Sequence, residues 1–188
     1  MTLWFGVFLA LLGATGIMRL GEMAVSAVRM ARNRDAVVSE PWLFPLMALL
    51  HTGLVALPAA EVWFLHVPFR PWLAVLSGAV LVLATALRIW TLATIGRSWN
   101  VRVVVPEDIR IATTGPYRFI RHPNYLVVIL EIAALPLFHG AWMSAIFLTL
   151  LNAFVLLHRI RTEEAALAQI PAWVDAMRDR ARLLPGLF

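Results

Sequence analysis

The chain has 188 residues, of which 61% are hydrophobic and 14% charged, and its mean hydropathy is +0.80. Soluble domains are roughly half apolar and about a quarter charged, so this composition excludes an ordinary soluble protein and indicates one embedded in a bilayer. The length suits a single domain, and no linker rich in Pro, Gly or Ser divides it. The lack of cysteine excludes disulfides, thiolate nucleophiles and cysteine-based metal sites, and we expect no bound metal.

Five stretches are apolar enough to lie in hydrocarbon, where a spanning helix needs about 20 residues. They are residues 3–18, 42–65, 71–93, 125–138 and 140–157. The last two are short and are separated only by Phe138-His139-Gly140, so we interpret them as a tight helical hairpin. Pro123 is expected to begin its first helix, because proline suits the first helical turn.

The distribution of basic residues explains the net charge of +5. All 16 basic residues are Arg, and with five spans nearly all of them fall in loops on one side of the membrane. Only Arg70 lies on the opposite side, and Arg88 lies within the third span. Because positive loops stay cytoplasmic, the N-terminus is expected outside and the C-terminus inside, with no nucleic-acid partner. The fold class predicted is therefore an all-α, polytopic membrane protein with about five transmembrane helices and a cytoplasmic C-terminal helical tail.

The sequence predicts the secondary structure of the segments between and after the spans less strongly than it predicts the spans. Residues 21–40 mix charged and small apolar residues, which indicates a cytoplasmic helix extension followed by a loop, before Pro41 opens the second span. Residues 101–105 form a short extended piece that Pro106 stops. The tail from His158 is predicted to be a helix broken near Pro171, followed by an amphipathic piece over 172–182.

Several polar residues fall inside the predicted spans, where an ionisable group costs about 2.5–3.5 kcal/mol and needs a partner or a wet cavity. Glu61 is close enough to the outer end of its span to reach lipid headgroups. Arg88 can snorkel to the interface or pair with Glu131. Glu131 lies roughly 12 Å beyond Pro123 along a helix, well inside the hydrocarbon. The others are His51 and Asn152.

Two clusters on the cytoplasmic side have chemistry that a ligand site would use. The first is the segment Gly115–Tyr125, where aromatic and basic side chains surround His122 at the expected start of a helix. The second is Arg159-Ile160-Arg161-Thr162-Glu163-Glu164 after the last span. Each has an ordinary alternative: a juxtamembrane belt for the first, and a solvated i,i+4 pair for the second. If the hairpin brings them together, one pocket would suit a zwitterionic cofactor with ribose hydroxyls.

The order of motifs in roughly the second half of the chain resembles the isoprenylcysteine carboxyl methyltransferase family, in its bacterial membrane branch. The matching residues are Leu87-Arg88, Leu92, Gly96-Arg97-Ser98-Trp99, Gly115-Pro116-Tyr117-Arg118, Arg121-His122-Pro123-Asn124-Tyr125 and Arg159 to Glu164. The resemblance implies one methyltransferase domain over 1–188, with three N-terminal spans in 1–95 and the catalytic half in 96–188. It also implies S-adenosylmethionine as cofactor, and a bacterial inner-membrane location with a cytoplasmic active site.

Carried over by position, the family's cofactor pocket would use residues from both clusters. Tyr117, Arg121, His122 and Tyr125 would hold S-adenosylmethionine from one side, and Glu163 and Glu164 from the other. The family's tyrosines after the glutamate pair are replaced here by Trp173 and Met177, and an early glycine in the helix after the motif is replaced by Leu126-Val127-Val128.

The acceptor is expected to be a lipophilic molecule that enters from the bilayer, either an isoprenylcysteine or an alkylpyrone- or alkylresorcinol-type lipid. A carboxylate acceptor needs no base, whereas an enol or phenol must lose a proton. Glu131 is predicted to take that proton or hold the acceptor, and Arg88 or Arg97 to bind an anionic oxygen. The alternatives are an NADPH-dependent membrane reductase of sterols or enones, which has a similar motif, and a non-catalytic membrane scaffold.

Overall fold

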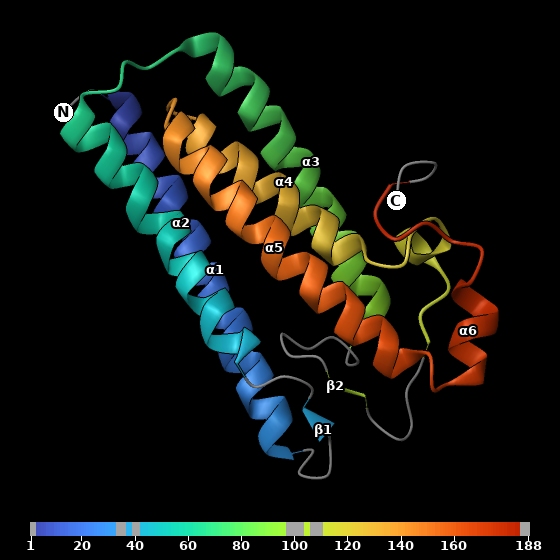
Figure 1. Ribbon diagram of the computed structural model, residues 1–188. Coiled ribbons are helices and arrows are strands. Elements are labelled where there is room, and N and C mark those ends of the chain that lie inside the picture. Colours follow the sequence, from blue (N-terminus) through green and yellow to red (C-terminus); the bar gives the residue numbers. More distant parts are fainter. Residues whose placement is uncertain (1–2, 33–36, 39–41, 97–103, 106–110, 185–188) are drawn as a thin grey trace.

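The computed structural model describes residues 3–32, 37–38, 42–96, 104–105 and 111–184. Long helices run side by side along most of this part of the chain, and a short one follows them (Figure 1). They are α1 (Leu3–Arg32), α2 (Leu43–Leu65), α3 (Pro71–Ile95), α4 (Pro123–Leu137), α5 (Trp142–Leu167) and α6 (Pro171–Met177). The all-α class is thereby confirmed.

Four of these helices, α1, α2, α3 and α5, are long and apolar enough to cross a bilayer. Their outward faces are apolar as well: Leu3 is 77% exposed, Phe64 73% and Val82 69%, which suits lipid contact. The protein is therefore an integral membrane protein. The expected fourth span differs in length, since α4 has 15 residues and is about 22 Å long, less than the ~30 Å hydrocarbon core.

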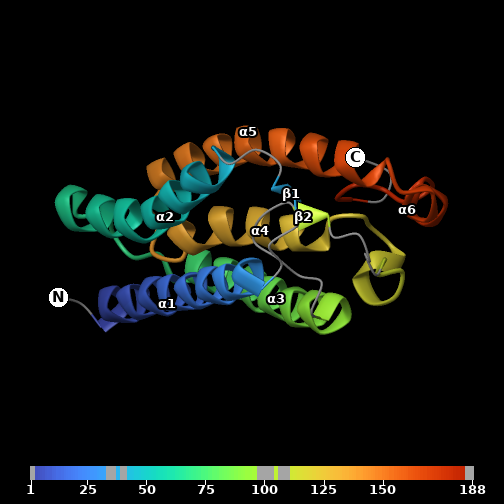
Figure 2. The same ribbon diagram turned by 90° about the horizontal axis from the view of Figure 1, so that it is seen from below.

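The short α4 lies between α3 and α5 and is covered on both sides (Figures 1 and 2). In the view of Figure 2, α2 and α5 lie on one side of α4, and α1 and α3 lie on the other. Most of its side chains are buried, Val127 and Ile132 almost completely. A buried helix can be polar at chosen positions without exposing those groups to lipid, and α4 contains both Tyr125 and Glu131.

Proline and glycine set the ends of the last helices as expected. α4 begins at Pro123 and is followed by the predicted tight turn, in which Gly140 has φ +97°. α5 then continues to Leu167, so the fifth span and the first part of the tail are one helix. α6 starts at Pro171 and ends at Met177, short of the predicted amphipathic piece over 172–182.

The loops on the motif side contain one small sheet in the described residues. β1 (Val37–Val38) pairs antiparallel with β2 (Val104–Val105), so the predicted extended piece is present in its last two residues. Its first three residues, 101–103, lie outside the described part. The predicted helix extension after span one is confirmed, because α1 runs to Arg32.

The expectation that Glu61 reaches lipid headgroups is wrong. Its buried carboxylate accepts hydrogen bonds from the backbone nitrogens of Met143 and Ser144, at 3.1 and 2.7 Å, and from the Ser144 hydroxyl at 2.6 Å. A carboxylate at a helix N-terminus satisfies unpaired N–H groups and complements the helix dipole. Glu61 therefore caps α5 from α2, and its role is structural.

Candidate functional site

The first cluster begins with a 3-10 turn, η2 (Gly115–Arg118), that packs against the end of α3. Gly115 has φ +57°, and a Cβ built there would lie 2.3 Å from Thr94 Oγ1 and 3.1 Å from Trp90 Nε1. Only glycine fits both the left-handed backbone and this close approach. The turn thus fixes where the chain enters α4.

The next residues pair with the C-terminal tail. The backbone nitrogens of Arg121 and His122 donate to the carbonyl oxygens of Ala181 and Arg182, at 2.9 and 3.0 Å. The Arg121 guanidinium also donates to three tail carbonyls, those of Met177, Arg178 and Arg180, at 2.8–3.0 Å. Arg121 therefore holds the tail in place, and its predicted contact with a cofactor stays a prediction.

His122 meets the second cluster, as the sequence predicted. As the N-cap residue of α4, it lies with Nε2 3.1 Å from Oε1 of Glu164 on α5. Arg121 Nη1 lies 3.3 Å from the same oxygen, and Arg182 donates to the other oxygen at 2.9 Å. The twin-glutamate segment and the Arg-His-Pro segment thus form one site, although 42 residues separate His122 from Glu164.

Tyr125 connects the other glutamate of the pair, Glu163, to Arg159. Its hydroxyl donates to Glu163 Oε2 and accepts from Arg159 Nε at 2.7 Å, while the Arg159 guanidinium also contacts the sulfur of Met47 on α2. The ring of Tyr125 stacks on that of His122, with 5.2 Å between centroids. These contacts connect the α4 entrance, α5 and α2.

Tyr117 lies in η2 with its side chain buried, and its carbonyl accepts from Arg180 Nη1. Burial raises the pKa of its phenol above the ordinary value, and the nearby Glu163 charge raises it further. The hydroxyl therefore keeps its proton at neutral pH and is suited to donate a hydrogen bond.

A pocket opens beside Tyr125 between α1, α2, α4 and α5. Its lining combines apolar side chains with Arg19, Glu22, His51, Asn124 and Arg159. Asn124 lines the pocket, and its Oδ1 atom is buried and has no hydrogen-bond partner among the described residues. An unpaired buried acceptor costs about 1–3 kcal/mol, which a bound donor group would recover.

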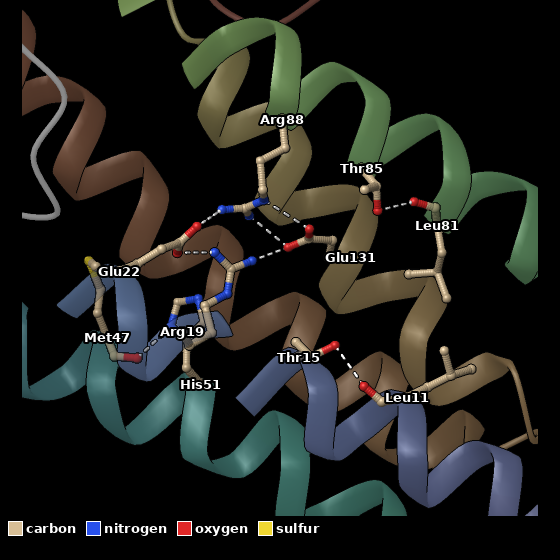
Figure 3. A network of polar contacts seen from close by, with 10 residues as sticks. All are labelled: Leu11, Thr15, Arg19, Glu22, Met47, His51, Leu81, Thr85, Arg88 and Glu131. Atoms are coloured by element: carbon tan, nitrogen blue, oxygen red, sulfur yellow. Dashed lines mark hydrogen bonds and ion pairs between the residues drawn. The ribbon is translucent and has the colours of Figure 1, made fainter. Parts of the chain in front are cut away.

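Glu131 and Arg88 belong to a buried charge cluster (Figure 3), whose other two members, Arg19 and Glu22, line the pocket. Arg88 bonds Glu131 through Nε at 3.1 Å and Nη2 at 2.8 Å, and it also pairs with Glu22. Arg19 pairs with Glu22 at 2.6 Å and with Glu131. We call Arg19, Glu22, Arg88 and Glu131 the charge quartet. The possible Arg88–Glu131 pair is confirmed, and snorkelling of Arg88 is not what the structure shows.

Sequence reasoning missed several residues of this region. Arg19 and Glu22 follow the first apolar stretch, where nothing in the sequence indicates burial, whereas α1 places both side chains largely inside the bundle. Met47 and Arg182 lie in no sequence motif that would indicate a role in the site. Only the structure shows that they contact Arg159 and Glu164. Arg97, one of the three predicted catalytic residues, lies outside the described residues. Catalytic roles for Glu131 and Arg88 stay predictions.

These observations define a polytopic helical membrane protein with a cluster of charged and aromatic side chains where α4 and α5 meet the C-terminal tail. The chain belongs to the isoprenylcysteine carboxyl methyltransferase family, whose model matches residues 75–169. It is therefore a membrane methyltransferase, of a family that uses S-adenosylmethionine. The matched region runs from α3 to the end of α5 and includes His122, Tyr125 and both glutamates.

Two bacterial relatives are similar to the chain over different lengths. The uncharacterized protein YpbQ of Bacillus subtilis (strain 168) is 30% identical over 166 residues, which cover 87% of this chain and 98% of the relative. An uncharacterized protein of Haemophilus influenzae is 27% identical over 93 residues, which cover 49% of this chain and 54% of that protein.

Proposed function

We propose that this chain transfers a methyl group from S-adenosylmethionine to an oxygen of a lipophilic acceptor. The acceptor oxygen would be a carboxylate, enol or phenol, on an isoprenylcysteine or on an alkylpyrone- or alkylresorcinol-type lipid. The observation that supports this most is the contact of His122 with Glu164, and of Tyr125 with Glu163, close to a pocket that Tyr125 and Asn124 line.

The chemical groups at this site suit the cofactor. Glu163 and Glu164 can accept hydrogen bonds from its amine and ribose hydroxyls, and Asn124 Oδ1 offers a further acceptor. His122 and the buried phenol of Tyr117 can bind its carboxylate or ribose oxygens. When bound, S-adenosylmethionine supplies an electrophilic methyl group. The protein supplies alignment and exclusion of water, worth up to ~7–11 kcal/mol for well-oriented reactants.

An apolar groove supports entry of the acceptor from the bilayer. It lies between α4 and α5 and is lined by Ile129, Ala153, Leu157 and Leu183 among others. Asn152 and Leu156 line both this groove and the polar pocket, so the two cavities border the same turn of α5. An alkyl chain in the groove would leave its polar head near Tyr125. We further propose a bacterial inner-membrane location with this site at the cytoplasmic face.

The direct test is titration calorimetry of S-adenosylmethionine and S-adenosylhomocysteine with the purified protein in detergent. We expect Glu163→Ala and His122→Ala each to raise Kd at least ~10-fold, because a hydrogen bond to a charged group is worth about 1.5–3 kcal/mol. The matched control is Asp179→Ala, which removes a carboxylate that is 89% exposed in the same cytoplasmic tail and should leave Kd unchanged.

The same titrations separate the alternatives. NADPH is included as a second ligand, because a membrane reductase would bind it and would not respond to S-adenosylmethionine. A scaffold would bind neither ligand, and its melting temperature would not rise with ligand; a binder at 100 times Kd gains ~2.7 kcal/mol of stability. Undiminished binding by both variants would refute the proposed site.

A further inference from the structure

Asn152 is a polar residue within the apolar stretch of α5, between Leu151 and Ala153. Its side chain is buried, with only 3% of the residue exposed. Its amide forms no hydrogen bond with any side chain or backbone group in the part of the chain that the structure describes. A buried amide without a partner lowers stability, and leucine would fill a similar space without that cost. A polar residue kept at this depth therefore indicates a bound molecule.

Other polar residues of the spans are satisfied within the protein. Thr91 donates to a backbone carbonyl of its own helix at 2.7 Å. Glu61 accepts hydrogen bonds at the start of α5, and Arg88 pairs with Glu131 at 2.8 Å (Figure 3). Asn152 has no such partner among the described residues, so the structural roles of these other residues do not extend to it.

The place of Asn152 is the wall that two cavities share. It lines both the polar pocket beside Tyr125 and the apolar groove between α4 and α5. Among the described residues, the polar side-chain atoms that are sealed from solvent without a partner belong to Arg19, Asn124 and His139. The amide of Asn152 is not one of them, so it reaches space that a bound molecule can occupy.

The path of an acceptor through the groove passes this amide. The groove is open toward lipid, because Ala153 and Leu157 in its lining are exposed. Asn152 and Arg159 lie on the same face of α5, two turns and roughly 10 Å apart, and Arg159 donates to the Tyr125 hydroxyl. A chain whose polar head lies near Tyr125 and which follows α5 into the bilayer therefore meets Asn152 roughly 10 Å from its head.

We propose that Asn152 determines acceptor specificity by binding a hydroxyl or carbonyl group in the acceptor's chain, about 10 Å from the methylated oxygen. The inference rests on the proposed methyl transfer, and it adds the class of acceptor: a lipid whose chain is oxygenated at that depth. The amide nitrogen donates to the chain oxygen, and Oδ1 accepts from a chain hydroxyl. A plain alkyl or isoprenyl chain leaves the amide unpaired and is the poorer acceptor.

The experiment measures kcat/KM for two series of acceptors, N-acetyl-S-alkylcysteines and 5-alkylresorcinols of one chain length. Each series contains the plain chain and versions with one hydroxyl at successive carbons, so the result does not depend on which head is methylated. With wild type, a hydroxyl about 10 Å from the head should raise kcat/KM at least ~10-fold over the plain chain. Asn152→Leu should lose this preference and methylate the plain chain at least as well as wild type does. Its Kd for S-adenosylmethionine should be unchanged.

The matched control is Thr149→Val, which removes a hydroxyl at nearly constant volume. Thr149 lines the same groove one turn earlier on α5 but does not line the polar pocket, so this variant should keep the preference. The melting temperature in detergent without acceptor gives a readout that does not depend on turnover. Asn152→Leu should be at least as stable as wild type, because it removes an unpaired amide.

Equal kcat/KM for the plain and all hydroxylated chains in wild type would overturn the inference, while methylation of the plain chains would leave the proposed function standing. A preference that Asn152→Leu retains would also overturn it. So would a lower melting temperature of Asn152→Leu, which would show that the amide already has a structural partner. Failure of wild type to bind S-adenosylmethionine would instead refute the proposed function.

Discussion

The charge quartet is the most demanding arrangement of single residues in this protein. Arg88 and Glu131 are 3% and 5% exposed, inside a helix bundle whose outer surface is apolar. Removing charged groups from water costs several kcal/mol each, and this cost is offset only where every charge has a well-placed partner. Two arginines and two glutamates supply such partners to one another, so the unit holds α1, α3 and α4 together with no net charge.

We predict that Glu131→Leu destabilises the protein by about 3–5 kcal/mol, because Arg88 and Arg19 are left with one carboxylate between them. The double variant Arg88→Met, Glu131→Leu should recover most of this loss, since the remaining Arg19–Glu22 pair is again neutral. Thermal unfolding in detergent measures both. A double variant less stable than Glu131→Leu alone would show that Arg88 stabilises the fold independently of Glu131.

At the scale of elements, the site depends on how the η2 turn docks on α3. The turn sets the entrance of α4, and the backbone of residues 121–122 then pairs with residues 181–182 of the tail. A change in the conformation of the η2 turn would therefore displace His122 and Tyr125 together.

The prediction at this scale is that Gly115→Ala destabilises the protein and weakens S-adenosylmethionine binding. Gly96→Ala is the control, because Gly96 has the same φ of +57° but no described residue lies within 4 Å of its Cβ position. A residue with a Cβ is strained at a positive φ, so Gly96→Ala should show only this backbone cost. Gly115→Ala should cost more, because its Cβ would clash with Thr94. Equal melting temperatures for the two variants would contradict the docking argument.

The sequence predicted the helices and the meeting of the two motif clusters better than it predicted the pocket. Apolar length identifies spans, and Pro123 and Gly140 identify the ends of the hairpin, because these signals are local. Glu61 was misread because its partners on α5 are more than 80 residues away in sequence. The burial of Arg19 and Glu22 is not predictable for the same reason, because the sequence does not indicate which helix a charged pair near a helix end will contact.

At the scale of the whole molecule, the two ends of the bundle differ in chemistry. One end holds the α2–α3 connection and the α4–α5 turn, where Gly140 packs near Val67 and Pro68. Trp63, Trp72 and Trp142 are exposed at this end, as in an aromatic belt at a membrane interface. The other end contains the proposed ligand site, the arginine-rich tail and α6 (Figure 1).

This asymmetry predicts the orientation in the membrane. Because the chain contains no cysteine, one introduced cysteine is a unique label. Arg70→Cys places it at the N-cap of α3, and Asp179→Cys places it just after α6, at the opposite end. We expect a membrane-impermeant maleimide to label Arg70→Cys in bacterial spheroplasts and to label Asp179→Cys only after permeabilisation, because arginine-rich segments stay in the cytoplasm. The reverse pattern would place the ligand site outside, and labelling of both in spheroplasts would contradict their separation by the bilayer.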